Sequence, residues 1–269
     1  MLKGVTIGQF FPGDSLIHRL DPRTKLLATI ALIAIVFVSK GFAGFLLIAA
    51  FVLLCCASTG IHLKFLFRGL KPILFIVLFT FVLNLFFQSG EHVLWQWGAV
   101  KITEEGLRMA SFMAARLILL VVASQLLTLT TSPISLTDGL ESLFRPLEVV
   151  KFPAHEIAMM MSIALRFIPT LMDEADKIMK AQKARGADFE TGNLVQRAKA
   201  MVPLLVPLFV GAFRRAEELA LAMDARCYRG GAGRTRMKQL KFGLIDVLAA
   251  LAILALLAAV IVLNAFKVW

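Results

Sequence analysis

Charged side chains are scarce in this sequence, and cysteine, histidine and tyrosine are scarcer still. Charged residues make up 17% of the 269 residues, which include 3 cysteines, 4 histidines and 1 tyrosine. Cys55 and Cys56 are adjacent and Cys227 stands alone, so no spacing resembles a disulfide framework or a Cys/His zinc motif. We therefore expect no metal site and no bound cofactor.

The motifs of common enzymes are also missing. No G-x-x-x-x-G-K-[ST] sequence is present, so the chain is not expected to hydrolyse ATP itself. His155 and Glu156 are not followed by the second histidine that a metalloprotease motif needs. Since no nucleophile–base pair or cluster of carboxylates stands out either, we expect a non-catalytic protein.

Apolar residues dominate the sequence. They account for 59% of the chain, against roughly 45–50% in soluble domains, and the mean hydropathy is +0.80. The net charge of +11 comes from basic residues beside long apolar runs. This placement fits the positive-inside rule of membrane proteins better than nucleic-acid binding. Residues 1–20 hold no apolar stretch followed by a cleavage site, so we expect no cleavable signal peptide.

Five segments are long and apolar enough, or nearly so, to cross a bilayer, which takes about 20 residues. They are residues 26–39, 42–58, 72–88, 107–130 and 244–266. The first three are short, a deficit that helix tilt can absorb. We expect an all-α integral membrane protein, with a bundle of four spans in residues 1–130 and a final span in residues 243–269.

Basic residues near the span ends predict the orientation in the membrane. The residues expected on the cytoplasmic side are Arg19, Arg23 and Lys25 before the first span, and Lys64, Arg68 and Lys71 between the second and third. The loop at 89–106 then faces the opposite side, where Trp95 and Trp97 suit a membrane interface. We expect a cytoplasmic N-terminus in a multi-pass protein of the cell membrane.

Residues 131–242 differ from the rest, with 17 basic and 12 acidic residues, and are expected on the cytoplasmic side. Apolar residues recur with a period near 3.6 over residues 154–183, which predicts a long amphipathic helix bent at Pro169. A shorter helix is expected at 136–144. A second long helix is expected at 193–225, but its apolar middle is only 14 residues long and is interrupted by Pro203 and Pro207. We expect this middle to be too short and too broken for an independent span.

Each of the two long helices is expected to end on an Ala-Arg pair. The first ends at Ala184, Arg185 and Gly186, and the second at Ala225, Arg226 and Cys227. One interpretation is ordinary capping, in which a basic last turn complements the helix dipole and glycine allows a left-handed exit. The other is docking, because an exposed guanidinium can bind a carboxylate through two hydrogen bonds. The duplication of the pair on two apolar helices favours docking.

The sequence resembles the T component of energy-coupling factor (ECF) transporters, a group of ATP-driven importers of vitamins and metals, over nearly its whole length. The stretches that carry the resemblance are Gly8 with Gln9, PGDS at 12–15, LDPRTKL at 20–26, RFIPTL at 166–171, AQKARGADF at 181–189, PLLVPLF at 203–209, FRRAEELA at 213–220 and ARCYRG at 225–230. The paired Ala-Arg-Gly sites are the most specific part. The second departs from the family pattern, since Cys227 stands where glycine is usual.

The resemblance implies a membrane-embedded coupling subunit of a prokaryotic importer. Two ATPase subunits would bind the two helix ends, with Arg185 and Arg226 as the docking residues and Ala184, Gly186 and Ala225 shaping each site. A separate substrate-binding S component would pack on the helices from the membrane side. The N-terminal stretches resemble the shared form, in which one T component serves several S components in turn. No nucleic-acid partner is implied.

Three alternatives remain open on the sequence. The chain could be a permease that forms the substrate path itself, although few polar residues lie at mid-membrane depth. Pro203 and Pro207 either end regular helix or form a hinge between the coupling helices. Arg116, near the middle of the fourth span, either contacts Asn84, Gln125 or a backbone carbonyl, or transmits motion.

Overall fold

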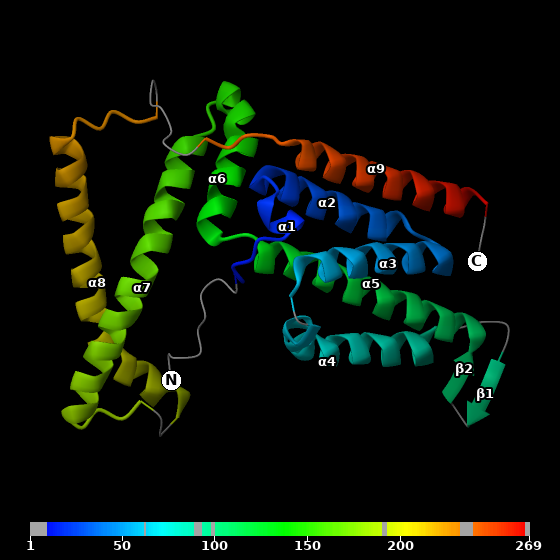
Figure 1. Cartoon of the computed structure of the whole chain (residues 1–269). Helices are drawn as coiled ribbons and strands as arrows, with labels where there is room; N and C mark the ends of the chain where they lie inside the picture. Colours follow the sequence, from blue (N-terminus) through cyan, green and yellow to red (C-terminus); the bar gives the residue numbers. More distant parts are fainter. Residues whose placement is uncertain are drawn as a thin grey trace. The chain divides into compact units, whose positions relative to one another are not determined.

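A computed structural model describes residues 10–61, 63–88, 93–97, 100–189, 193–231 and 239–266 (Figure 1). The contacts within the chain divide it into two compact units. One, here the bundle unit, consists of Gly8–Gly139 and Gln239–Trp269. The other, here the helix-pair unit, contains Leu140–Lys238. The helix-pair unit is therefore an insertion into the sequence of the bundle unit.

The bundle unit is built from helices with one small β-hairpin (Figure 1). Its elements are α1 (Leu16–Arg19), α2 (Pro22–Val38), α3 (Phe42–Thr59), α4 (Leu63–Phe87), β1 (Val93–Trp97), β2 (Val100–Thr103), α5 (Glu104–Thr130), the first part of α6 (Pro133–Phe144) and α9 (Leu244–Ala265). Helix α5 packs against α2, α3 and α4, and α9 packs against α2 and α3. The core thus forms around α2, α3, α5 and α9.

The buried side chains of this core are aliphatic and aromatic, and come from all four helices. Among them are Leu32, Ile35 and Val36 of α2, Phe45, Ile48 and Val52 of α3, Leu119 and Ala123 of α5, and Leu256 and Val260 of α9. Helix α4, in contrast, contributes only Leu66 to this core among its described side chains, and the most apolar window of the helix has no buried residue. An apolar surface of this size is typical of a helix that faces lipid or another protein.

The all-helical membrane fold expected from the sequence is confirmed, and most of the predicted helices match. The span predicted at 42–58 is α3, the one at 107–130 lies within α5, and the one at 244–266 is α9. The third predicted span, 72–88, begins too late, because α4 starts at Leu63 and continues through Pro72. A proline inside a helix removes one backbone hydrogen bond and bends the helix, but it does not have to end it.

Five helices of the described part are long and apolar enough to cross a membrane, but the set differs by one from the predicted set. Helix α2 has only 17 residues and is not among them. Its place is taken by α8 (Leu194–Ala225), whose mean hydropathy of 1.3 over the best window is the lowest of the five. The expectation that Pro203 and Pro207 interrupt this segment is wrong, since the helix continues through both. By length and composition α8 qualifies as a candidate span, whereas its predicted place on the cytoplasmic side stays a prediction.

The loop predicted at 89–106 contains regular structure that the sequence did not indicate. Strands β1 and β2 pair antiparallel, with Trp97 opposite Val100 and an irregularity near Val93. The hairpin then leads directly into α5, where the Thr103 hydroxyl accepts a hydrogen bond from the Gly106 amide at 3.1 Å. A polar N-cap of this kind satisfies one of the free amides of the first turn.

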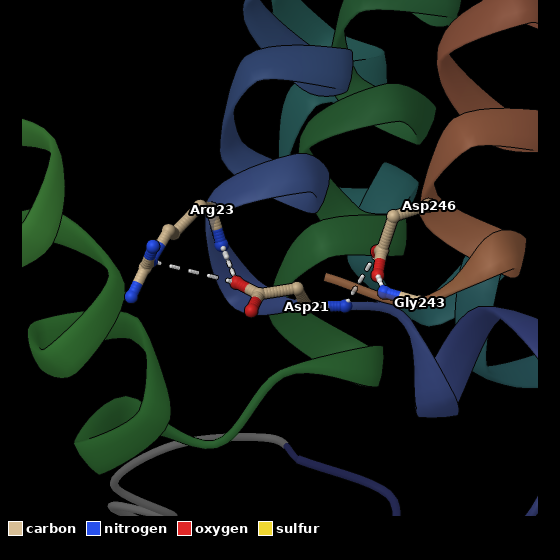
Figure 2. Close-up of polar contacts among 4 residues, drawn as sticks. All are labelled: Asp21, Arg23, Gly243 and Asp246. Carbon is tan, nitrogen blue, oxygen red and sulfur yellow. Dashed lines mark hydrogen bonds and ion pairs between the residues drawn. The ribbon is translucent and has the colours of Figure 1, made fainter. Parts of the chain in front are cut away.

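The start of α2 is the most polar part of the bundle core (Figure 2). Asp21 caps the helix, and its Oδ1 accepts a hydrogen bond from the Arg23 amide at 2.9 Å. The Asp246 carboxylate of α9 accepts two more, from the Asp21 amide at 2.8 Å and from the Gly243 amide at 2.7 Å (Figure 2). Asp21 and Asp246 are both only 6% exposed. One buried carboxylate therefore ties the first turns of α2 and α9 together.

The same helix start also receives the segments on either side of the insertion. A Cβ added to Gly139 would come within 3.0 Å of Pro22, so the backbone of α6 approaches α2 closely there. The Arg23 guanidinium lies over the Phe242 ring, 5.3 Å from its centre. The buried ammonium of Lys25 donates to the Thr130 carbonyl at the end of α5 (2.9 Å). The stretch DPRTK at 21–25 thus holds the chain both where it leaves the bundle and where it returns.

The turn between α2 and α3 is fixed by two polar side chains from other helices. Arg116 of α5 donates to the Ser39 carbonyl at 3.4 Å, with the rings of Phe37 and Phe45 each 5.6 Å from its guanidinium carbon. Asn264 of α9 donates to the Val38 carbonyl and accepts from the Lys40 amide. Of the contacts predicted for Arg116, the one to a backbone carbonyl is present. The faces of aromatic rings attract a cation, so the two rings stabilise the guanidinium charge where water is absent.

Replacing Asp246 by alanine is expected to destabilise the bundle strongly. The change removes a charged acceptor and leaves two buried backbone amides without a hydrogen-bond partner. The free energy of unfolding should fall by about 3 kcal/mol. The thermal unfolding midpoint in detergent should fall by roughly 6–12 °C. Asp14, which is exposed, supplies the control, and Asp14→Ala should leave the midpoint unchanged. An Asp246→Ala chain as stable as the control would contradict the role assigned to the carboxylate.

Candidate functional site

The candidate site lies in the helix-pair unit, which consists of the end of α6, the 3-10 helix η2 (Arg145–Val150), α7 (Ala154–Ala184) and α8. Helices α7 and α8 have 31 and 32 residues, each long enough to extend well beyond their mutual contact. The amphipathic pattern of α7, predicted from the 3.6-residue period, allows one face of this helix to pack on α8. The predicted boundaries of 154–183 and 193–225 agree with the helices within one residue.

Helices α7 and α8 pack in opposite directions (Figure 1). Glu174, late in α7, forms an ion pair with Arg215 at 2.5 Å, and its carboxylate faces Gly211, where an added Cβ would lie 3.0 Å away. An apolar groove is lined by the earlier α7 residues Ile163 and Phe167 and by later α8 residues, among them Leu219 and Met223. Because earlier residues of one helix meet later residues of the other, the C-terminal ends of α7 and α8 point away from each other.

The end of α7 forms a Schellman cap. Arg185 is the cap residue, and Gly186 follows in the left-handed region with φ of 87°. The Gly186 amide donates to the Lys183 carbonyl and the Ala187 amide donates to the Gln182 carbonyl, both at 3.0 Å. These two hydrogen bonds define the motif and satisfy carbonyls that the helix end would leave free.

The end of α8 repeats this geometry in full. Arg226 is the cap residue, and Cys227 takes the left-handed position with φ of 55°. The Cys227 amide donates to the Asp224 carbonyl at 2.8 Å, and the Tyr228 amide donates to the Met223 carbonyl at 3.0 Å. The departure from glycine at this position therefore leaves the cap intact, although the backbone conformation is unfavourable for a residue with a Cβ.

Both candidate arginines are open to solvent. Ala184, Arg185, Ala225 and Arg226 are all exposed, as are Gly186 and Cys227. Within the described part of the chain, neither Arg185 nor Arg226 takes part in a hydrogen bond or ion pair through its side chain. Each helix end thus presents a guanidinium with its donors available, beside a small alanine.

Comparisons with known proteins agree with this architecture. The model of the CbiQ family, described as a cobalt transport protein, matches residues 13–238. The chain is 56% identical over 268 residues to the energy-coupling factor transporter transmembrane protein EcfT of Thermosediminibacter oceani, covering all of both chains. The EcfT of Bacillus subtilis is 48% identical over 265 residues, 98% of this chain and all of its own. This chain belongs to the CbiQ family, as an EcfT-type transmembrane component of an ECF transporter.

An EcfT-type protein is a non-catalytic, multi-pass membrane component of its transporter, as the sequence predicts. The EcfT of Ruminiclostridium cellulolyticum, 55% identical over 248 residues, covers 92% of both chains. All of these relatives are bacterial. Of the stretches that carry the resemblance, Gly8 and Gln9 lie outside the described residues, whereas the two Ala-Arg sites lie within them.

The structure brings the members of each Ala-Arg site together but does not bring the two sites together, because α7 and α8 run in opposite directions. Pro203 and Pro207 lie inside α8 and are exposed, and the ribbon of α8 is bent in its first half (Figure 1). The Glu174–Arg215 ion pair was not identified from the sequence. Both are charged residues on predicted helices. They become partners only because α7 and α8 cross at this point, which the sequence does not indicate.

Substitutions at the two caps should change the stability of the chain in opposite directions. A residue with a Cβ in the left-handed region costs roughly 1 kcal/mol relative to glycine. Cys227→Gly should therefore stabilise the chain by about that amount, and Gly186→Ala should destabilise it similarly, as measured by thermal unfolding in detergent. Cys227→Ala is the matched control, since it removes the thiol but keeps the strained conformation. A gain in stability from Cys227→Ala equal to that from Cys227→Gly would contradict the backbone explanation.

Proposed function

We propose that the two arginine-tipped helix ends are the points at which this EcfT-type chain binds two ATPase subunits of its transporter. The observation that carries the proposal is the equivalence of the two ends. Each presents an exposed guanidinium at the cap of a long helix, in the same backbone geometry. A guanidinium binds carboxylates through paired, charge-assisted hydrogen bonds, so each end suits an acidic groove on a partner.

The opposite directions of α7 and α8 suit two partners rather than one. From the Glu174–Arg215 ion pair, Arg185 and Arg226 are each 11 residues further along their helices. At 1.5 Å per residue this places each end roughly 16 Å from the crossing, on opposite sides. The small side chains of Ala184 and Ala225 leave room for a partner beside each arginine. Gly186 and Cys227 turn the chain away from the docking face.

The apolar face of α8 offers a surface for a second kind of contact, apart from the two arginine-tipped ends. Its most exposed large side chains include Val206, Phe209, Val210 and Phe213, all at least 56% exposed. In the proposal this face packs on membrane lipid and on a substrate-binding S component, with one S component bound at a time and several able to exchange. The imported substrate is then a vitamin or another micronutrient, held by the S component rather than by this chain.

In the proposed mechanism, α7 and α8 lie on the cytoplasmic side, together with the N-terminus. ATP binding closes the two ATPase subunits and carries the arginine-tipped ends with them. The helix pair changes its crossing, and the S component reorients in the membrane and releases substrate inside. Pro203 and Pro207 provide the hinge in α8, because each removes a backbone hydrogen bond from the helix interior.

Removing either arginine should disrupt assembly of the transporter. Arg185→Ala or Arg226→Ala is expected to reduce substrate uptake at least tenfold, and the double change should also abolish co-purification of the ATPase subunits. Loss of one partner from a buried ion pair costs about 3–5 kcal/mol. Arg197→Ala is the matched control, since Arg197 is an exposed arginine at the other end of α8. Normal uptake and normal ATPase retention in the double variant would disprove the docking role.

The hinge predicts a different phenotype. Replacing both Pro203 and Pro207 by alanine restores the missing amides and should straighten and stiffen α8. ATPase subunits should still co-purify, whereas ATP-driven uptake should fall several-fold. Pro169→Ala, a change of the same kind in α7, tests whether the effect is specific to α8. Uptake that is unchanged in the Pro203→Ala/Pro207→Ala chain would rule out the hinge.

A further inference from the structure

We infer that His155 and Gly231 form a brace that positions the second arginine-tipped end, with Arg226, relative to the start of α7. The inference rests on the docking role proposed for Arg226. It assigns a function to two residues that the docking proposal leaves unused. Both belong to the helix-pair unit, as does Glu141, which completes the brace.

The His155 ring, at the start of α7, is held by Glu141 through one of its nitrogens, and the other nitrogen is buried. Its Nδ1 lies 3.0 Å from Oε1 of Glu141, in the last turns of α6, where the carboxylate side chain is only 13% exposed. Its Nε2 is shielded from solvent. The turn between α6 and α7 is itself compact, with Phe144 and Phe152 packed edge to face at 5.7 Å. The ring is therefore a fixed surface rather than a side chain free to rotate.

The chain that leaves α8 runs onto this surface. After the Schellman cap at Arg226, Gly230 adopts a left-handed conformation with φ of 85°, and the next residue is Gly231. A Cβ built on Gly231 would lie 2.5 Å from Cδ2 and 2.7 Å from Cγ of His155. Atoms do not approach so closely, so the contact admits glycine alone unless the ring moves. Five residues after Arg226, the backbone is thus stopped against the first turn of α7.

This contact gives the second docking end an anchor that passes through α7 and α6. Because only five residues separate Arg226 from Gly231, a shift of one changes where the other can lie. The sequence pattern fits this role, since Gly230 supplies the turn and Gly231 supplies the close approach. His155 and Gly231 are accordingly positioning residues, which act on docking through Arg226 and do not touch the ATPase themselves.

The test uses the complete transporter, purified in mild detergent, and measures the ATPase subunit retained by this chain after washing. In an Arg185→Ala background, where retention depends on the second end, Gly231→Ala should lower retention about five-fold, within the range of coupling seen between neighbouring residues. In an Arg226→Ala background the same change should have no further effect. His155→Ala removes the ring that Gly231 meets, so the double variant His155→Ala/Gly231→Ala should retain as much ATPase subunit as His155→Ala alone, with no added loss from Gly231→Ala.

The possible results separate this inference from the docking proposal. If Arg226→Ala leaves retention unchanged in the Arg185→Ala background, the docking role fails. If Arg226→Ala lowers retention but Gly231→Ala is silent, or is equally damaging in both backgrounds, the brace is overturned. Should Gly231→Ala prevent folding, His155→Ala and His155→Asn replace it, since the asparagine amide can still donate to Glu141. Retention should then fall with alanine and remain within two-fold of normal with asparagine, and equal losses would overturn the brace.

Discussion

The buried carboxylate of Asp246 is the interaction on which the arrangement of the bundle depends. It accepts hydrogen bonds from the Asp21 amide, 225 residues away in sequence, and from the Gly243 amide, and so joins the starts of α2 and α9. A charged acceptor with two amide donors is stronger than a pair of neutral hydrogen bonds, and leaving the donors unpaired in the core would be costly. The start of α2 then becomes the fixed point against which α5, α6 and α9 are placed. The stretch DPRTK at 21–25 is consequently a structural junction, whatever else it does in the transporter.

Much of the helical framework could be predicted from the sequence, because it follows from local patterns. Long apolar runs located α3, α5 and α9, and the 3.6-residue period located α7; the bounds predicted for α7 and α8 agree with the structure within one residue. The predictions for α4 and α8 failed at prolines, because a proline was expected to end or interrupt a helix and instead lies within it. Pro72, Pro203 and Pro207 all lie inside continuous helices. The β-hairpin was missed for the opposite reason, since its short strands carry too few residues for a clear period.

The candidate site was partly predictable. The residues of the two Ala-Arg sites could be identified because the same pair recurs at the predicted ends of both long helices. Their relation in space could not, because it depends on the crossing of α7 and α8 and hence on the Glu174–Arg215 ion pair. Cys227 shows a further limit. It departs from the glycine of the family pattern, but the backbone hydrogen bonds of the Schellman motif hold it in the same conformation as Gly186.

The placement of the helix pair within the sequence has a consequence for protein engineering. The chain leaves the bundle beside Gly139, which contacts Pro22, and it returns at Phe242 and Gly243, which lie by Arg23 and Asp21. Both ends of the insertion are therefore anchored within the first turn of one helix. A segment attached in this way can be exchanged as a cassette between related chains, provided that a small residue is kept at 139 and an acidic acceptor at 246. The two arginine-tipped helix ends could then be transferred without redesigning the membrane bundle.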